Sequence, residues 1–186
     1  QQGVDYARFQ GGADGKTASD PRVGTAEACA TCHRNHGTPY QWELAPNGKA
    51  ADRTCTDCHM REVERPIAVG GPVRKTHSHA FPGARNDAHV GRAYGYATKI
   101  DGNEAVVTIT NKGAGHNFPT ELKQRAVESL VIVRDQDGKE IARSRLVFRD
   151  PYKRPYGLHL QVNTQIPSGE SREHRVPIGV ANGSVE

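Results

Sequence analysis

The sequence predicts an α+β chain, with a mainly irregular N-terminal domain of short helices followed by a small antiparallel β-sandwich of the immunoglobulin-like class. The side chains of Val, Ile, Leu, Met, Phe and Trp number 12 in residues 1–95 and 23 in residues 96–186. The first half is therefore too poor in apolar residues to build an ordinary core of its own. The second half contains stretches in which apolar and polar residues alternate, as in half-buried strands. We place the domain boundary at residue 95, near Tyr94–Thr98.

Bulk composition argues against two classes of partner. The net charge of +4 in 186 residues, with basic and acidic residues interspersed, is too small to indicate nucleic acid. The longest strongly apolar run is Leu130–Val133, whereas a membrane span needs about 20 apolar residues. We therefore expect no membrane span. The 20 Gly and 11 Pro residues indicate that much of the chain forms loops.

Residues 1–24 are rich in Gly, Asp, Gln and small side chains, which predicts an extended arm or a loosely packed loop. A disordered N-terminus explains the same composition. A short helix is expected over Thr25–His33, with Thr25 as a candidate N-cap. Further along, Arg61–Val73 contains two prolines and two glycines and is expected to be irregular.

All four cysteines belong to two copies of one motif, CATCH at Cys29–His33 and CTDCH at Cys55–His59. Each reads Cys-x-x-Cys-His, the pattern for covalent attachment of haem c. Two intervening residues put both sulfurs on one side of a turn, within reach of the two vinyl groups of a porphyrin edge, and the histidine then points at the iron. We expect two haem c groups, which would also supply the apolar bulk missing from the first domain. The expected attachment residues are Cys29, Cys32, Cys55 and Cys58, and the expected proximal iron ligands are His33 and His59.

Two other uses of paired cysteines fit the motif less well. A zinc site with four cysteine ligands needs no histidine after either pair, whereas here both pairs have one. A redox-active Cys-x-x-Cys is normally single and lies in a βαβ pattern, which is not visible in this sequence. Haem attachment is therefore the preferred interpretation.

The remaining histidines of the first domain are candidates for the second axial ligand of an iron. His79 is preferred, because Phe81 and Pro82 would stiffen the segment that carries it. The weaker candidates in this domain are His36, His77 and His89.

The stretch Cys55–Met60, followed by Ser78-His79-Ala80-Phe81, resembles the multihaem c-type cytochromes of bacterial respiration. In those families a Cys-x-x-Cys-His-Met motif precedes a Ser/Asp-His-x-Phe segment whose histidine ligates a haem, which implies that His79 is an iron ligand. The resemblance covers roughly residues 25–90. Family members often carry a histidine shortly after a tryptophan downstream of the first motif, but the six residues after Trp42 contain none. One haem must therefore receive its distal ligand from elsewhere.

Alternation and Val/Ile content predict strands in the second domain, with tight turns between them. The expected strands are Glu104–Asn111, Ala126–Arg134, Lys139–Phe148 and Ser171–Ile178, with further alternation at residues 158–162. About five or six short antiparallel strands suggest a small immunoglobulin-like sandwich. Because this number is low for a complete sandwich, a final strand is missing or comes from a neighbour.

Between the first two of these strands, His116 is flanked by two glycines and by Pro119. The glycines let the backbone approach a bulky group closely, and the proline fixes the exit of the loop. The sequence Gly-His-x-Phe-Pro-Thr resembles the loop by which some multihaem cytochromes with sandwich domains present a haem ligand, which implies that His116 is a distal ligand. A polar loop tip with an incidental histidine is the alternative. His159 and His174 lie in strand patterns and are expected to be structural or at the surface.

These residues predict a dihaem c-type cytochrome that transfers electrons in an extracytoplasmic respiratory chain, with His79 and His116 as distal ligands. Haem c is attached on the exported side of a membrane, so we expect a periplasmic or extracellular protein whose signal peptide was removed before Gln1. The expected partners are other redox proteins or copies of the chain, in a homo-oligomer or an extracellular filament of haems. The alternative is a small haem enzyme, a reductase or peroxidase, in which one iron keeps an open face.

Overall fold

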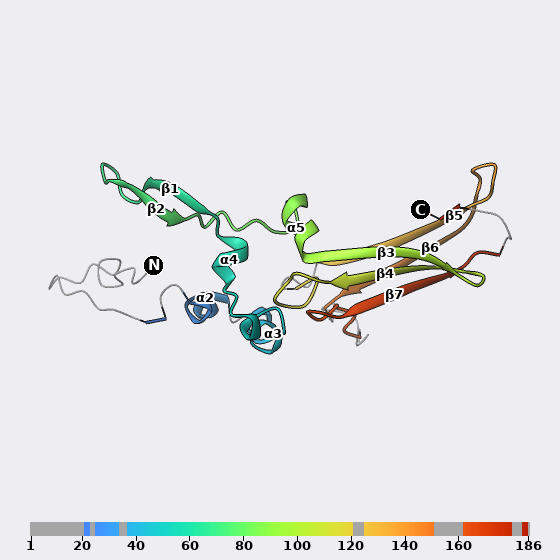
Figure 1. Cartoon of the computed structure of the whole chain (residues 1–186), viewed down its shortest axis with the longest axis horizontal. Coiled ribbons are helices and arrows are strands. Elements are labelled where there is room, and N and C mark those ends of the chain that lie inside the picture. The colour runs from blue at the N-terminus through green and yellow to red at the C-terminus, as the bar shows by residue number, and fades with distance from the viewer. Residues whose placement is uncertain are drawn as a thin grey trace, which may run out of the picture.

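The computed structural model describes residues 21–22, 25–33, 37–120, 125–150, 162–179 and 184–185. In Figure 1, short helices and a two-stranded hairpin lie towards one end of the molecule, and two β-sheets lie towards the other. Short helices together with antiparallel sheets agree with the predicted α+β class. The predicted N-terminal arm falls almost entirely outside the described residues.

The helices of the first part are short and carry little apolar side-chain packing. They are α2 (Ala26–His33), α3 (Thr38–Leu44), the 3-10 helix η1 (Lys49–Ala51), α4 (Cys55–His59) and α5 (Asp87–Ala93). Helix α4 begins with a capping box, in which the Asp57 carboxylate accepts a hydrogen bond from the Thr54 amide at 2.7 Å. Among the described residues up to position 100, Ala26 and Ala45 are the only buried hydrophobic side chains. The described residues of the first part thus form almost no protein core, in agreement with the low apolar content of this half of the sequence.

A two-stranded hairpin follows α4. Strand β1 (Glu62–Pro66) pairs antiparallel with β2 (Val73–His77), and Glu62 lies opposite His77. The expectation that Arg61–Val73 is irregular is therefore wrong for β1. Beyond β2, the Ser78 amide donates a hydrogen bond to the Arg61 carbonyl at 2.8 Å. The hairpin thus returns the segment after His77 to the C-terminal end of α4.

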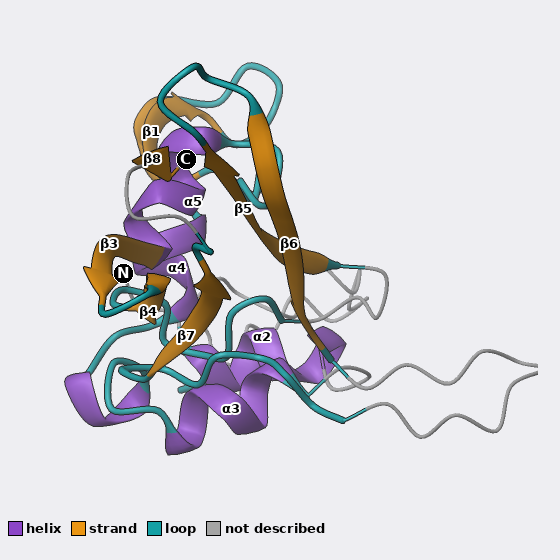
Figure 2. Cartoon of the chain, turned by 90° about the vertical axis from the view of Figure 1, so that its right-hand side faces the viewer, coloured by secondary structure: helices purple, strands orange, loops and turns teal. Residues whose placement is uncertain are grey.

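Two three-stranded antiparallel sheets make up the second part (Figures 1 and 2). In spatial order, one sheet contains β3 (Tyr94–Asp101), β4 (Glu104–Asn111) and β7 (Ser171–Pro177). The other contains β6 (Glu140–Arg149), β5 (Ala126–Arg134) and β8 (Ser184–Val185). The strands predicted at Glu104–Asn111 and Ala126–Arg134 are confirmed, whereas β3 was not predicted.

The strands β4 and β5 are consecutive in the chain but lie in different sheets. β4 pairs with β3 and β7, while β5 pairs with β6 and β8. The segment that carries His116 therefore crosses from one sheet to the other and does not close a hairpin between these two strands. The alternation predicted at residues 158–162 lies outside the described residues, except for Val162.

Apolar side chains from both sheets meet in two buried clusters. Their buried members are Ala105, Ile109, Val131, Val133, Phe148, Ile166 and Val176. Along β5, Val131 and Val133 are fully buried, while Leu130 is 46% exposed. This alternation is the pattern from which the strand was predicted. The second part thus has a core of its own and can serve as a rigid support for the loops at its edge.

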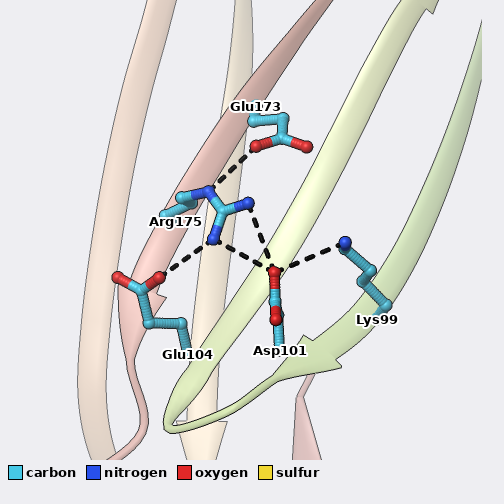
Figure 3. Close-up of polar contacts among 5 residues, drawn as sticks. All are labelled: Lys99, Asp101, Glu104, Glu173 and Arg175. Atoms are coloured by element: carbon cyan, nitrogen blue, oxygen red, sulfur yellow. Dashed lines mark hydrogen bonds and ion pairs between the residues drawn. The ribbon is translucent and has the colours of Figure 1, made fainter.

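Arg175 of β7 forms ion pairs with carboxylates beside the β3–β4 turn (Figure 3). Its guanidinium lies 3.0 Å from Glu104, 2.9 Å from Glu173 and 3.3 Å from Asp101. Lys99 lies 3.4 Å from the same Asp101 carboxylate. Because these side chains are exposed to solvent, the pairs contribute little to stability. They do connect residues of all three strands of this sheet.

His174 is buried between the two sheets. It thus has the structural role that was one of the two expected for it. It is 5% exposed, and its Nε2 and Nδ1 atoms lie 2.8 Å from Ser144 Oγ and 2.9 Å from Ser129 Oγ. Burial lowers the pKa of His174, because the charged imidazolium loses its hydration.

The stability of the second part is expected to depend on pH through His174. In the unfolded chain the imidazole has its ordinary pKa of about 6.5, so the unfolded state binds the proton more readily than the folded state. This stabilising contribution is complete above the unfolded pKa and is lost as the pH falls below it towards the lowered folded pKa. Denaturant unfolding at a series of pH values should show a steeper loss of stability below about pH 6.5 for the wild type than for His174→Gln, which cannot titrate. Equal slopes for the two proteins would contradict this role of His174.

Candidate functional site

The two Cys-x-x-Cys-His motifs lie on neighbouring helices, α2 and α4. All four cysteines are free thiols. A hydrogen bond to Cys55 lowers the pKa of Cys29 to about 7, and the same contact raises the pKa of Cys55. The thiols of the two motifs are therefore adjacent in space. Cys29 is half-buried and Cys32 is exposed, so the first pair is accessible for a covalent reaction of the thiolate.

The imidazoles of His59 and His116 are held in the same tautomer by backbone carbonyls. His59 Nδ1 lies 3.1 Å from the Pro82 carbonyl oxygen, and His116 Nδ1 lies 2.8 Å from the Asn117 carbonyl oxygen. A carbonyl oxygen can only accept, so each Nδ1 carries the proton and donates it. In the neutral ring the opposite nitrogen, Nε2, is then unprotonated and carries the lone pair. This is the form in which a histidine binds a metal, with its second nitrogen hydrogen-bonded to orient the ring.

The rings of these two histidines also lie near each other and are nearly parallel. The ring centroids of His59 and His116 are 6.2 Å apart, and the ring planes differ by 19°. Two imidazoles on opposite sides of one metal ion, with metal–nitrogen bonds of about 2 Å, have ring centroids about 6 Å apart. The distance between the two rings, though not by itself their orientation, is thus that of two histidines on one metal ion, and His59 belongs to a haem-attachment motif.

The loop that carries His116 is held against the first part by close backbone contacts at glycines. A Cβ atom on Gly113 would lie 2.1 Å from the Arg92 carbonyl oxygen, and one on Gly115 would lie 2.9 Å from the Asn47 carbonyl oxygen. Gly113 N also donates a hydrogen bond to the Ala93 carbonyl at 3.0 Å. The glycines were expected to let the loop approach a bulky group; in the structure they allow its close approach to the backbone of α5 and of the turn after α3.

Side-chain amides add a second set of contacts between α3 and this loop. Gln41 Oε1 accepts hydrogen bonds from the Asn117 amide at 3.2 Å and from the Thr120 hydroxyl at 2.7 Å. Gln165, which is 4% exposed, accepts from Asn117 Nδ2 at 3.0 Å and donates to the Pro119 carbonyl at 2.8 Å. A buried amide that loses its hydrogen-bond partner destabilises the folded protein. These hydrogen bonds therefore favour one position of the loop. Sequence analysis missed both glutamines, because no pattern distinguishes them from surface residues.

Phe81 contacts the histidines of both Cys-x-x-Cys-His motifs. Its ring lies 4.4 Å from the ring of His59 and 5.8 Å from that of His33, with interplanar angles of 6° and 11°. The ring of His79 lies 5.8 Å from Phe81 at 45°. The structure therefore brings three of the four histidines predicted as main ligands to one aromatic ring.

The other candidate histidines differ in their hydrogen bonds. His89 lies 4.7 Å from His59, ring to ring, and its Nδ1 accepts from Arg92 Nη2 at 2.9 Å. Because arginine only donates, the neutral His89 ring carries its proton on Nε2 and has no free lone pair there. Burial lowers the pKa of His89, and the charges of His59 and Arg92 lower it further. His77 donates from Nδ1 to the Met60 carbonyl at 2.9 Å, so its Nε2 lone pair is free.

Two histidines of the sequence, His36 and His159, lie outside the described residues. In the part of the chain that the structure describes, no group of three or more His, Cys, Asp or Glu side chains is placed to hold a bare metal ion. The same part contains no helix that is long and apolar enough to span a membrane.

Comparison with known proteins agrees with this site. Residues 22–64 match the family described as the doubled CXXCH motif. No curated protein matches the chain. Among solved structures, the chain is similar to a penta-heme cytochrome c552 from Thermochromatium tepidum, with 21% sequence identity and a TM-score of 0.61 over 92% of this chain and 51% of that one. The chain thus spans about half the length of that cytochrome and shares its fold. The comparisons thus show a doubled CXXCH motif at residues 22–64 and a fold shared with a solved multihaem cytochrome.

Proposed function

We propose that the chain is a dihaem c-type cytochrome that transfers electrons outside the cytoplasm, in the periplasm or at the cell exterior. The observation that carries this proposal is the pair of imidazoles from His59 and His116. Each has its Nδ1 proton on a backbone carbonyl, and their ring centroids are 6.2 Å apart. One belongs to an attachment motif and the other lies 57 residues away at the edge of a rigid pair of sheets.

Each attachment motif supplies a proximal ligand in this proposal. Cys29 and Cys32 hold one haem above His33. The second haem is held by Cys55 and Cys58 and is ligated by His59. His116 is the distal ligand of the same iron as His59.

The distal ligand of the iron at His33 is His79. The support is that the rings of both His33 and His79 lie 5.8 Å from Phe81. His77 is the alternative, because its Nε2 is free, whereas the hydrogen bond from Arg92 argues against His89.

The arrangement favours electron transfer over catalysis. Haem c supplies a one-electron ferric/ferrous couple, and two histidine ligands give it a lower potential than a histidine–methionine pair. Two histidines on one iron leave no face for a substrate. The chain's own residues orient the imidazoles through the Pro82 and Asn117 carbonyls and fix the distance between the two parts of the molecule.

The second part acts as a support for a ligand in this proposal. We take it as a small immunoglobulin-like sandwich that begins near residue 95. Its core is independent of the first part, so the loop at its edge can present His116 from a fixed base. The hydrogen bonds between Gln41 and this loop hold the second part in a fixed position with respect to the attachment motifs.

The proposal predicts two covalently bound haems in the native protein. Its intact mass should exceed that of the 20.3 kDa polypeptide by two haem groups, and both should remain after acid–acetone extraction. The visible and EPR spectra of the oxidised protein should show low-spin iron only. One haem, extractable haem, or a high-spin signal would contradict the proposal, and the last would favour a small haem enzyme with an open iron.

A further inference from the structure

Phe81 has a backbone conformation that bulky side chains avoid. Its φ of 49° lies in the left-handed region. Among the described residues, the one other non-glycine residue with positive φ is Asp52, at 53°, and aspartate tolerates this region better because its short side chain can bond to the backbone. A strained residue persists where surrounding contacts favour it, often at a functional position.

The contacts of Phe81 involve both attachment motifs. Its ring is nearly parallel to the His59 ring, at 4.4 Å and 6°, and to the His33 ring, at 5.8 Å and 11°. Parallel or offset aromatic rings at such separations attract each other beyond the burial of their area. A ligand imidazole can rotate about its bond to the metal, so a ring stacked on its face restricts that rotation.

The residue after Phe81 fixes the same histidine by a different contact. The Pro82 carbonyl oxygen lies 3.1 Å from His59 Nδ1. The backbone conformation of Phe81 contributes to the position of this carbonyl, because it sets the direction in which the chain enters Pro82. Two consecutive residues therefore contact the His59 ring: Phe81 stacks on its face, and the Pro82 carbonyl accepts a hydrogen bond from its Nδ1.

We infer that Phe81 is a positioning residue shared by the two haem sites, which fixes the planes of the His33 and His59 imidazoles with respect to each other. This inference rests on the proposed function and adds a coupling between the two irons. The orientation and hydrogen bonding of axial ligands tune the electronic structure of a haem iron. A change at Phe81 therefore reaches both irons, although Phe81 itself ligates neither.

The test compares EPR spectra of the oxidised dihaem protein in four forms. Phe81→Leu removes the ring and keeps apolar bulk, and both low-spin signals should shift from their wild-type g values. Phe81→Tyr keeps the aromatic ring, and both signals should stay at their wild-type g values. Tyr96→Leu is the matched control, because Tyr96 lies on β3 and is 71% exposed; it should leave both signals unchanged. Phe81→Met serves as a second ringless variant where the leucine form does not accumulate with two haems.

A wild-type measurement covers the case in which no ringless variant matures. During stepwise reduction, the NMR shifts of the Phe81 ring protons should change in two steps, one for each iron. The inference is overturned if a ringless variant with two haems shifts one signal or none, if Phe81→Tyr shifts both as far as Phe81→Leu, or if the ring protons respond to a single iron. Failure of the proposed function is distinct, because the wild type would then lack two low-spin signals at the outset.

Discussion

Replacement of His116 by alanine should turn one of the two haem irons from low-spin to high-spin and leave the other unchanged. The reason is that the hydrogen bond of His116 Nδ1 to the Asn117 carbonyl leaves the lone pair of the neutral ring on Nε2, and the ring centroid lies 6.2 Å from that of His59. Its removal leaves an open face on the iron at His59. The reduced variant should then bind carbon monoxide at one haem, whereas the wild type should bind none. Visible and EPR spectra of His116→Ala measure the change directly.

Two controls separate loss of a ligand from general disturbance of the fold. His89→Ala removes a histidine that also lies near His59, at 4.7 Å, but whose Nδ1 accepts from Arg92; both irons should stay low-spin in this variant. Added imidazole should occupy the open face in His116→Ala and restore the low-spin spectrum. If both irons of His116→Ala remain low-spin without imidazole, His116 is not a ligand, and His77 becomes the first residue to test.

The attachment motifs could be identified from the sequence because a covalent bond to a rigid porphyrin fixes the spacing of its residues. The strands β4 and β5 could also be predicted from the sequence, because one face of each strand is buried and their apolar residues alternate. β3 carries a weaker signal: it is an edge strand in which residues 96–101 are all exposed, so burial does not require apolar residues there. The hairpin β1–β2 was missed for the same reason, because most of its residues are exposed.

The sequence indicated that His116 lies in a constrained loop, but it did not indicate the partner of that histidine. The pairing depends on β4 and β5 lying in different sheets, and strand patterns do not determine which strands become neighbours. The hydrogen bond from Arg92 to His89, by contrast, is a local contact between residues three apart on α5, but α5 itself was not predicted. Association with copies of the chain stays a prediction; the exposed side chains of Tyr96 and Ile100 on β3 are consistent with it.

A second large effect is expected from Gly113→Ala, although Gly113 ligates nothing. The new Cβ atom would lie 2.1 Å from the Arg92 carbonyl oxygen and 3.6 Å from the Ala93 Cα. Both neighbours are backbone at the end of α5, so neither can rotate away as a side chain could. The loop must therefore move from α5, which carries His116 away from His59. Overpacking of this kind costs about 1–3 kcal/mol, and part of the protein should become high-spin at one iron.

Gly91→Ala is the matched control for this prediction. Gly91 lies within α5, and a Cβ atom there would meet nothing within 4 Å. Alanine in a helix interior is more stable than glycine by about 0.5–1 kcal/mol, so this variant should unfold at slightly higher denaturant concentration and keep a low-spin spectrum. Gly113→Ala should unfold at lower concentration and show a high-spin fraction that grows with temperature as the loop detaches. An unchanged spectrum and midpoint for Gly113→Ala would show that the close contact with Arg92 does not hold His116 in place, and the hydrogen bonds of Gln41 and Gln165 would then have to hold the loop.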